Sequence, residues 1–437
     1  MARSARAQEE IRRFLDIGAV QVAELDLDGD EAVLRPGPGS PPVTHGEVFV
    51  LVRRRGRPVG TLLGRVPEGA DAKTVLAERA RAEYAAAQGG EPGEDGGAGE
   101  GGGAGEPPYA SVVVATRERA GQLARALDSL LAQDHPRFEI VVVDNAPVTS
   151  ETRELIERKY AERVRYVCEP VPGLAVAHNT GLAAARGEVV AFTDDDVVAD
   201  PRWLTELTAP FAADPGLGCS TGLILPARLT TPAQVLLESH GGFAKGFTPR
   251  TYDPARPPGD EPLFPFTAGR FGSGANMAFR TAALRSVGGF DPATGAGTAA
   301  RGGDDLYGFV RVLAQGHRLR YTPSALVWHH HRETWQDLET QAYGYGAGLT
   351  AYLTAVLVNR PALLPAFLAR LPRGLAHARA LTAVRETEGG GAPGDHDTRT
   401  HPWPRRLSRL QRRGMVYGPV GYLRARRALR ARGEGAR

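Results

Sequence analysis

The stretch EVVAFTDDD, residues 188–196, decides the fold of this chain. A short apolar run that leads directly into three carboxylates is typical of a buried strand ending at a polar edge. Strands of this kind, apolar on both faces, belong to parallel sheets covered by helices. In such sheets ligands bind beyond the carboxyl ends of the strands. The stretch therefore predicts an α/β sheet with a charged site at its edge.

The same pattern repeats upstream of residue 188. Short apolar runs alternate with segments whose leucines or alanines recur at helical spacing, which predicts a Rossmann-like, mostly parallel sheet with helices on both faces and right-handed crossovers. The predicted strands are 111–115, 139–143, 164–168 and 188–192, and the predicted helices span 123–131, 151–160 and 174–185.

Polar residues follow these strands at the edge where a ligand is expected. Thr116 and Arg117 follow the first strand, and Asp144 and Asn145 follow the second. Asp144 is a candidate acceptor for a donor group of a nucleotide base or ribose. An aspartate in this position can equally cap the next helix, and both interpretations stay open.

The triple aspartate, residues 194–196, is harder to explain as a surface loop. Three adjacent carboxylates at the end of a buried strand repel one another and call for a cation. Asp194 and Asp196 share one face if the backbone stays extended, and their oxygens suit Mg²⁺ or Mn²⁺. The alternative is a solvated acidic loop, followed at Asp200 and Pro201 by a helix cap and first turn.

Three downstream motifs add candidate residues. The run FGSGAN, residues 271–276, indicates a close backbone approach to a ligand, or a plain turn. The run GGDDL, residues 302–306, places two carboxylates at the start of a helix, where they face a cleft or cap that helix. The run WHHH, residues 328–331, follows an apolar stretch and is a candidate metal contact or a set of core histidines.

Composition limits the function classes and the compartments that fit this chain. The 437 residues are 42% hydrophobic and 24% charged, with a formal net charge of +3, which does not indicate nucleic-acid binding. Cys168 and Cys219 match no metal or disulfide spacing and fit a reducing compartment. The N-terminus lacks the apolar stretch of a signal peptide, and no run of about 18 apolar residues predicts a membrane span.

A run of Gly, Glu, Ala and Pro divides the chain. Residues 88–108 are predicted to be a flexible linker because they cannot bury a core. Residues 1–87 form a small α/β or α+β domain of unassigned role, with strands at 49–52 and 59–63 and a helix at 72–87. We expect the catalytic domain at 109–346 and a helical, basic region at 347–437.

Across 109–346 the sequence resembles the bacterial family 2 glycosyltransferases, an inverting group with the GT-A fold. The motifs that carry the resemblance are SVVVATRER at 111–119, VVVDN at 141–145, AHNTGLAAARG at 177–187, FTDDD at 192–196, GANMAFR at 274–280, GGFD at 288–291 and GGDD at 302–305. Each motif is weak alone, and their order and spacing make the set specific.

The resemblance implies a role for each matched residue. Asp305 would be the general base, with Asp304 standing where the family often has glutamate. The metal would be Mn²⁺ or Mg²⁺ in a DXD motif. The nucleotide-sugar-binding residues would be Thr116, Arg117, Asp144, Asn145, Asn179, Arg186, Asp194, Asp195, Gly274 and Asn276, and the metal ligands Asp196 with His329 or His331.

The implied reaction is transfer of one sugar from a nucleotide-diphosphate sugar to an acceptor hydroxyl, with inversion. Ala115 replaces the family's usual proline, and Tyr307 replaces an acidic residue often found two positions after the base. The Gln-x-x-Arg-Trp motif of processive synthases is absent, which favours a single transfer. The alternatives are a nucleotidyltransferase on the same kind of sheet and a non-catalytic nucleotide- or sugar-binding protein.

Partners and location follow as expectations. The acceptor would be a lipid-linked glycan, a polysaccharide or a small molecule, in cell-envelope or natural-product glycosylation. We expect a cytoplasmic protein that binds no nucleic acid. Arginines between 405 and 432, interleaved with Tyr417, Tyr422 and leucines, suggest peripheral contact with the inner face of a membrane; the alternative is a solvated basic helix packed on the catalytic domain.

Overall fold

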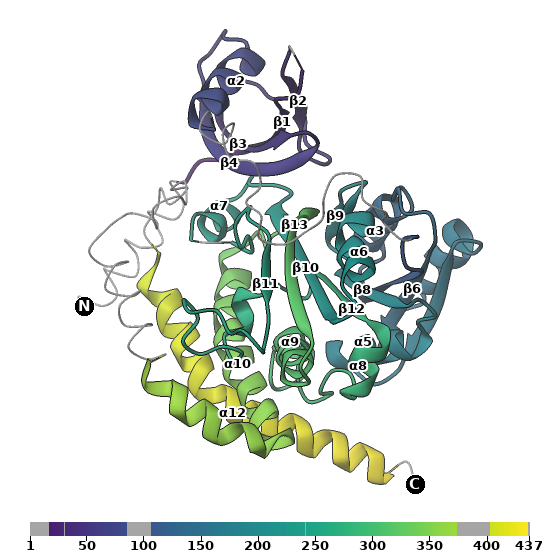
Figure 1. Ribbon diagram of the computed structural model, residues 1–437. Coiled ribbons are helices and arrows are strands. Elements are labelled where there is room, and N and C mark those ends of the chain that lie inside the picture. Colours follow the sequence, from purple (N-terminus) through teal and green to yellow (C-terminus); the bar gives the residue numbers. More distant parts are fainter. Residues whose placement is uncertain (1–16, 30, 85–105, 241, 374–402, 436–437) are drawn as a thin grey trace, which may run out of the picture.

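The computed structural model describes residues 17–29, 31–84, 106–240, 242–373 and 403–435. They form a small N-terminal sheet, a large central sheet and a set of C-terminal helices (Figure 1). The predicted linker, 88–108, lies outside the described residues except for its last three positions.

In its described residues, the N-terminal domain is a four-stranded sheet with one helix. Its strand order is β2-β1-β3-β4, with β1 and β3 parallel and the other pairs antiparallel. The elements are β1 (Gln21–Asp26), β2 (Val33–Pro36), β3 (Gly46–Arg54), β4 (Arg57–Val66) and α2 (Ala72–Glu83). The two predicted strands fall within β3 and β4, whereas β1 and β2 were not predicted.

Strand β3 is buried on both of its faces. Val48, Val50 and Val52 pack with α2 in one apolar cluster. Phe49 and Leu51 point the other way and pack against residues of the central domain. The N-terminal sheet is therefore a layer between its own helix and the large domain, at the top of Figure 1.

The central sheet has nine strands. Along it the order is β11-β13-β10-β12-β8-β5-β6-β7, with β9 paired to β13. Six strands run in one direction, because only β9, β11 and β12 pair antiparallel to their neighbours. The strands are β5 (Ala110–Thr116), β6 (Phe138–Asn145), β7 (Val164–Glu169), β8 (Val189–Asp194), β9 (Val197–Ala199), β10 (Leu217–Pro226), β11 (Arg250–Tyr252), β12 (Asn276–Arg280) and β13 (Arg318–His329).

Helices cover both faces of this sheet with two separate apolar clusters. On one face lie α3 (Ala120–Leu130), α4 (Glu151–Leu155) with the π-turn after it, and α6 (Trp203–Ala213). On the other lie α5 (Leu174–Ala184), α8 (Thr281–Ser286), α9 (Asp304–Ala314), α10 (Trp335–Asn359) and α12 (Arg405–Gly435). The predicted α/β fold is confirmed, including the four strands and three helices that were placed from the sequence.

The described part of the C-terminal region is helical, as predicted. The expected boundary at 346/347 falls inside α10, which continues unbroken from Trp335 to Asn359. Among the described residues no single helix is long and apolar enough to cross a membrane. Helices Trp335–Asn359 and Pro361–Arg373 reach that length and composition only when taken together, and they meet at a bend of 110°.

Candidate active site

The three aspartates lie where β8 gives way to β9. The backbone turns at Asp195 and Asp196, so the condition under which Asp194 and Asp196 would share one face of an extended segment is not met. The reason is that Val197 pairs with His329 at the end of β13, which pulls the chain back across the sheet edge. The turn still brings Asp194, Asp196 and His329 together, with one ligand atom of each within 4.8 Å of the others.

Asp195 has a different set of partners. Its Oδ2 accepts a hydrogen bond from Thr116 Oγ1 at 2.7 Å, and its Oδ1 accepts one from Arg119 at 3.1 Å. The same guanidinium lies 3.4 Å from Asp196 Oδ2. Arg119 was not predicted as a site residue; its signal was a basic residue just past the first strand, in the same motif as Arg117. Arg117 itself is exposed.

The charge of this cluster calls for a cation. Burial, followed by the nearby Asp196 and Asp195, raises the pKa of Asp194 well above its ordinary value. One guanidinium cannot neutralise three carboxylates. Asp196 Oδ1 is buried and accepts no hydrogen bond from the described residues. Two carboxylates and an imidazole are a donor set that Mn²⁺ accepts, so Asp194, Asp196 and His329 fit a divalent metal.

His331 does not join that group and instead lies behind His329. The Nε2 atom of His329 lies 3.3 Å from Asp196 Oδ1, and its Nδ1 lies 3.2 Å from Nδ1 of His331. On the far side, His331 Nε2 lies 3.1 Å from Oε2 of Glu238, on α7 (Pro232–Ser239). Of the two predicted histidines, only His329 lies in the group that could hold a metal ion, and Glu238 is an addition that no sequence motif indicated.

Asp305 lies at the start of α9 and is held by two backbone amides. Gly274 N–H donates to its Oδ2 at 2.9 Å, and Leu306 N–H donates to its Oδ1 at 2.8 Å. Burial, followed by the charge of Asp304, raises the pKa of Asp305 to about 6. Each oxygen keeps a free lone pair, so the carboxylate can accept a proton from a hydroxyl placed against it.

Asp304 points away from Asp305, into the protein. Its Oδ2 lies 3.1 Å from Nδ1 of His178 on α5, and both side chains are buried. The imidazole of His178 also packs against the rings of Phe192 and Phe290. The structure therefore separates the two predicted catalytic carboxylates: Asp305 is partly exposed, and Asp304 is buried beside His178.

Asp144 lies at the same edge of the sheet, at the end of β6. Its Oδ2 accepts a hydrogen bond from Tyr166 Oη at 2.9 Å. Its Oδ1 is buried and has no hydrogen-bond partner among the described residues. Burial raises the pKa of this carboxyl. An unused acceptor beside an aromatic ring can take a donor group of a nucleotide base.

The structure does not bring four of the other predicted residues to the cluster. The side-chain amide of Asn145 bonds backbone atoms of Val171 and Gly173, and that of Asn179 bonds Phe290 N and O. Asn276 is fully buried and bonds Leu223 O, Ala325 O and Trp203 Nε1. Arg186 lies at the opposite edge, where its backbone N–H meets Ser111 and Glu139 near the starts of β5 and β6. These four residues support the fold.

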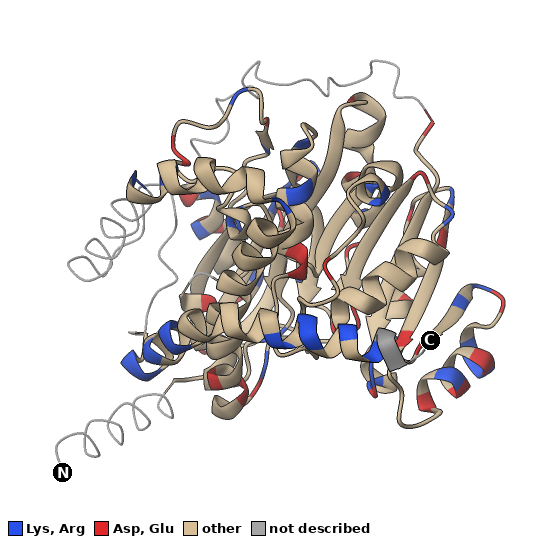
Figure 2. Cartoon of the chain, turned by 90° about the horizontal axis from the view of Figure 1, so that it is seen from below, with Lys and Arg blue, Asp and Glu red and all other residues tan. Residues whose placement is uncertain are grey.

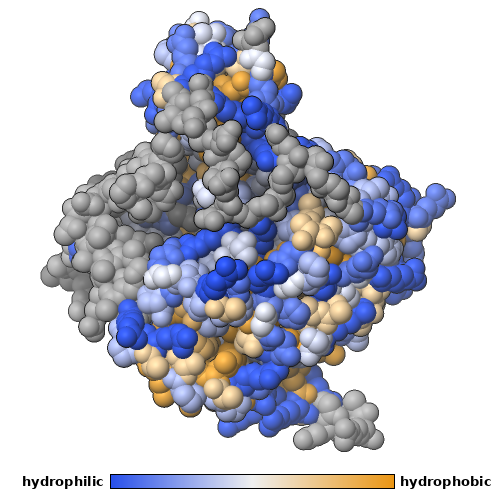
Figure 3. Space-filling model, viewed as in Figure 1, coloured by the Kyte–Doolittle hydropathy of each residue, from blue (hydrophilic) through white to orange (hydrophobic). Residues whose placement is uncertain are grey.

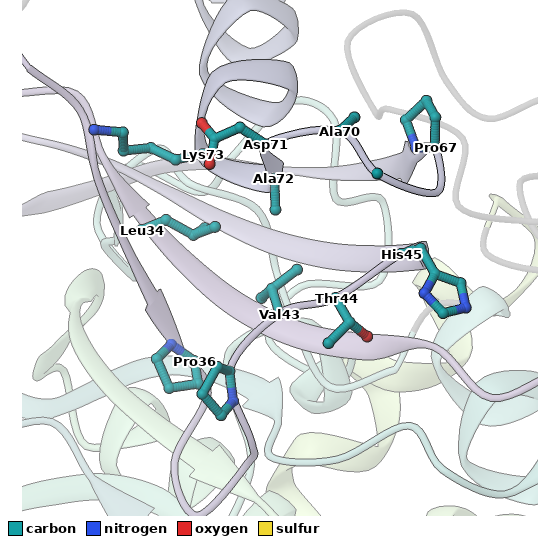
Figure 4. Close-up of a pocket in the computed structure, with 12 residues that line it drawn as sticks. Leu34, Pro36, Val43, Thr44, His45, Pro67, Ala70, Asp71, Ala72 and Lys73 are labelled. Carbon is teal, nitrogen blue, oxygen red and sulfur yellow. The ribbon is translucent and has the colours of Figure 1, made fainter.

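A separate pocket of about 400 Å³ opens in the N-terminal domain (Figure 4). Leu34, Val43, His45 and Lys73 are among the side chains around it. Asp71, at its rim, already accepts hydrogen bonds from Thr74 as the cap of α2. None of the predicted site residues lines this pocket, and it has no paired carboxylates. The chemistry therefore belongs at the edge of the central sheet.

Fold and site together define an α/β enzyme with an acidic cluster at the carboxyl edge of its sheet. Residues 111–286 match the family model described as glycosyl transferase family 2. This match lies within the segment that carries the motifs and agrees with the family resemblance drawn from them.

Similar proteins are known in several organisms. The pre-mycofactocin glycosyltransferase of Mycobacterium tuberculosis is 29% identical over 54% of this chain and 46% of its own length. The O-antigen biosynthesis protein RfbC of Myxococcus xanthus is 26% identical over 74% of this chain and 26% of its own. This chain thus spans less than half the length of both relatives. The solved mannosyltransferase PcManGT of Pyrobaculum calidifontis, in complex with GDP-Man and Mn²⁺, is 21% identical, with a TM-score of 0.42 over 73% of this chain and 86% of that one.

Proposed function

We propose that this protein transfers a single sugar from a nucleotide-diphosphate sugar to an acceptor hydroxyl, with inversion of the anomeric centre. The observation that carries the proposal is the juxtaposition of two groups at one sheet edge. Asp194, Asp196 and His329 form a cation-binding cluster, and the carboxylates of Asp304 and Asp305 lie within electrostatic range of Asp194.

Asp305 is the general base of this mechanism. Its pKa of about 6 leaves it ionised at neutral pH, yet basic enough to take a proton as the acceptor oxygen attacks. The amides of Gly274 and Leu306 hold the carboxylate in one orientation. Its place at the N-terminus of α9 also favours the ionised form. A single displacement at the anomeric carbon inverts its configuration.

The donor lies along the same edge in this proposal. Asp144 receives the base, and Thr116 and Arg119 hold Asp195 beside the ribose and diphosphate. A divalent metal, Mn²⁺ or Mg²⁺, held by Asp194, Asp196 and His329 would supply positive charge against the leaving diphosphate. The backbone N–H of Gly274 donates a hydrogen bond to Asp305, and in this proposal Gly274 lies beside the bound donor.

The acceptor is assigned only by class: a hydroxyl on a lipid-linked glycan, a polysaccharide or a small molecule. Lys245 lies within electrostatic range of Asp305. A cation near the base suits an acceptor that carries negative charge. We place the protein in the cytoplasm, in peripheral contact with the inner face of the membrane through α12.

Two measurements test the proposal. Thermal stabilisation by UDP, GDP or dTDP should require Mn²⁺, because a ligand that binds only the folded state raises its melting temperature. With the nucleotide known, sugar transfer by Asp305→Asn should fall by about 10²- to 10⁴-fold while metal-dependent stabilisation stays. Wild-type turnover in this variant would remove Asp305 from its role.

The same assays separate the rival functions. Release of pyrophosphate, in place of a nucleoside diphosphate, would identify a nucleotidyltransferase. Metal-dependent stabilisation by a nucleotide, without turnover of any nucleotide sugar, would identify a non-catalytic binding protein. The presence of both the cluster and a positioned base supports the transferase over both rivals.

A further inference from the structure

The C-terminal helix α12 exposes an apolar row between two groups of arginines. At spacings of three and four residues, its outer face carries, in order, Arg409, Arg413, Val416, Val420, Leu423, Arg427 and Arg430. Val416 is 81% exposed, Val420 46% and Leu423 44%. Seen from below in Figure 2, the helix is tan in its middle and blue towards both ends.

The orientation of this face is set by glycines on the inner side of the helix. A Cβ atom on Gly414 would lie 2.1 Å from Tyr343 O, and one on Gly418 would lie 2.0 Å from Thr350 Oγ1. Thr350 also donates a hydrogen bond to Met415 O at 2.7 Å. Because α12 packs backbone to backbone on α10, it cannot rotate to bury its apolar row.

Helix α12 is also strongly basic. Between residues 405 and 433 there are ten arginines and neither aspartate nor glutamate. Among the described residues, Arg406 pairs with Glu339 on α10, and no ion pair with a carboxylate is recorded for the other nine. In Figure 3 apolar and hydrophilic residues lie side by side on the lower part of the molecule, over the C-terminal helices.

We propose that this face of α12 binds the surface of a membrane that contains anionic lipids. Val416, Val420 and Leu423 would enter the boundary between headgroups and acyl chains, and the arginines on both sides would contact lipid phosphates. The helix is already formed and docked, so binding requires no folding step. Tyr422 takes no part, contrary to the expectation from the sequence, because it is buried and donates a hydrogen bond to Asp291.

Two other occupants fit this face less well. A second copy of the chain would bring arginines against arginines in either direction, because the row has arginines at both ends. A nucleic acid would neutralise the arginines but has no counterpart for three exposed apolar side chains between them. An anionic lipid surface offers phosphates to the arginines and an apolar boundary to the three side chains between them.

The test is flotation of the full chain with vesicles. Wild type should float with vesicles of phosphatidylcholine and phosphatidylglycerol, less so in high salt, and should not float with phosphatidylcholine alone. Val416→Asp with Val420→Asp, and separately Arg409→Glu with Arg413→Glu, should each reduce the bound fraction about tenfold. Val148→Asp, at an 80% exposed site on the loop after β6, is the matched control and should float as wild type does.

Three results would overturn the proposal: no flotation of wild type with the anionic vesicles, undiminished flotation of the Val416→Asp, Val420→Asp variant, or a dimer in solution that this variant dissociates. These substitutions lie at exposed positions, so their melting temperature should match that of wild type. The inference is independent of the transfer reaction, because Asp305→Asn should float normally and the α12 variants should still bind nucleotide.

Discussion

Arg53 on β3 and Asp200, the residue after β9, form an ion pair with 2.5 Å between Nη2 and Oδ2. Arg53 also pairs with Glu24 on β1, at 2.7 Å. The guanidinium is thus shared by the N-terminal sheet and the segment that follows the turn at Asp195 and Asp196. Apolar contacts of Phe49 and Leu51 with the central domain flank this link. The small domain is therefore anchored beside the site.

Removing this guanidinium should destabilise the chain. Arg53→Ala leaves Glu24 and Asp200 as neighbouring, largely buried carboxylates, and breaking such a pair costs roughly 3 kcal/mol. We expect a clear fall in the melting temperature by calorimetry, smaller at low pH, where protonation of Glu24 relieves the repulsion; its pKa is already raised by burial. Lys73→Ala, which breaks the exposed pair with Glu31, is the control and should change little. Equal effects of the two variants would contradict the anchoring role.

Glu238 should influence metal affinity without contacting the metal. If His329 offers Nε2 to the metal, its Nδ1–H donates to His331 Nδ1, and His331 Nε2–H then donates to the Glu238 carboxylate. Partners of this kind set the tautomer of the ligand, and their loss typically weakens metal binding about 10- to 100-fold. Calorimetric titration with Mn²⁺ should show this loss for Glu238→Ala.

Two variants sharpen that test. Glu238→Gln retains an acceptor oxygen and should recover part of the affinity. Glu157→Ala, at an exposed site after α4, should bind Mn²⁺ as wild type does. An unchanged Mn²⁺ affinity in Glu238→Ala would show that His329 is oriented by other contacts.

The raised pKa of Asp305 predicts the acid limb of the pH profile. As pH falls through about 6 the base becomes protonated, so kcat/KM should fall about tenfold per pH unit below that value. The stability of the folded state should change with pH in the direction opposite to the rate. Between the ordinary pKa of an aspartate, about 4, and pH 6 the folded state binds the extra proton, so this group's contribution to stability decreases as pH rises. A flat rate from pH 7 down to 5 would exclude Asp305 as the base.

The close packing of α12 on α10 should not tolerate side chains at its glycines. Gly414→Val would place atoms within 3 Å of the backbone at Tyr343 and Ala347. We expect the helix to be displaced and to become sensitive to limited proteolysis, with a lower melting temperature. Gly121→Ala on α3, where no atom lies within 4 Å of the new Cβ, is the control and should be neutral or stabilising. Equal protease resistance of Gly414→Val and wild type would contradict this packing.

Local patterns in the sequence predicted much of the central sheet. The apolar runs that became β5, β6 and β8 are buried on both faces, so their hydrophobic pattern is continuous and easily recognised. The polar residues after them lie at one edge because parallel strands end together. Thr116, Asp144 and the three aspartates were located for this reason. Strands β1 and β2 were missed because they are short and mixed in polarity.

The sequence by itself determined which residue types gather at the carboxyl edge of the sheet, because strand direction and side-chain chemistry are local properties. Only the tertiary structure decided which of them meet. It turned His329 and Asp196 toward each other through the pairing of β9 with β13, and placed His331 behind them against Glu238. It also buried Asn276 and left Val416 in solvent. These choices depend on contacts between segments far apart in the chain, and no local pattern records them.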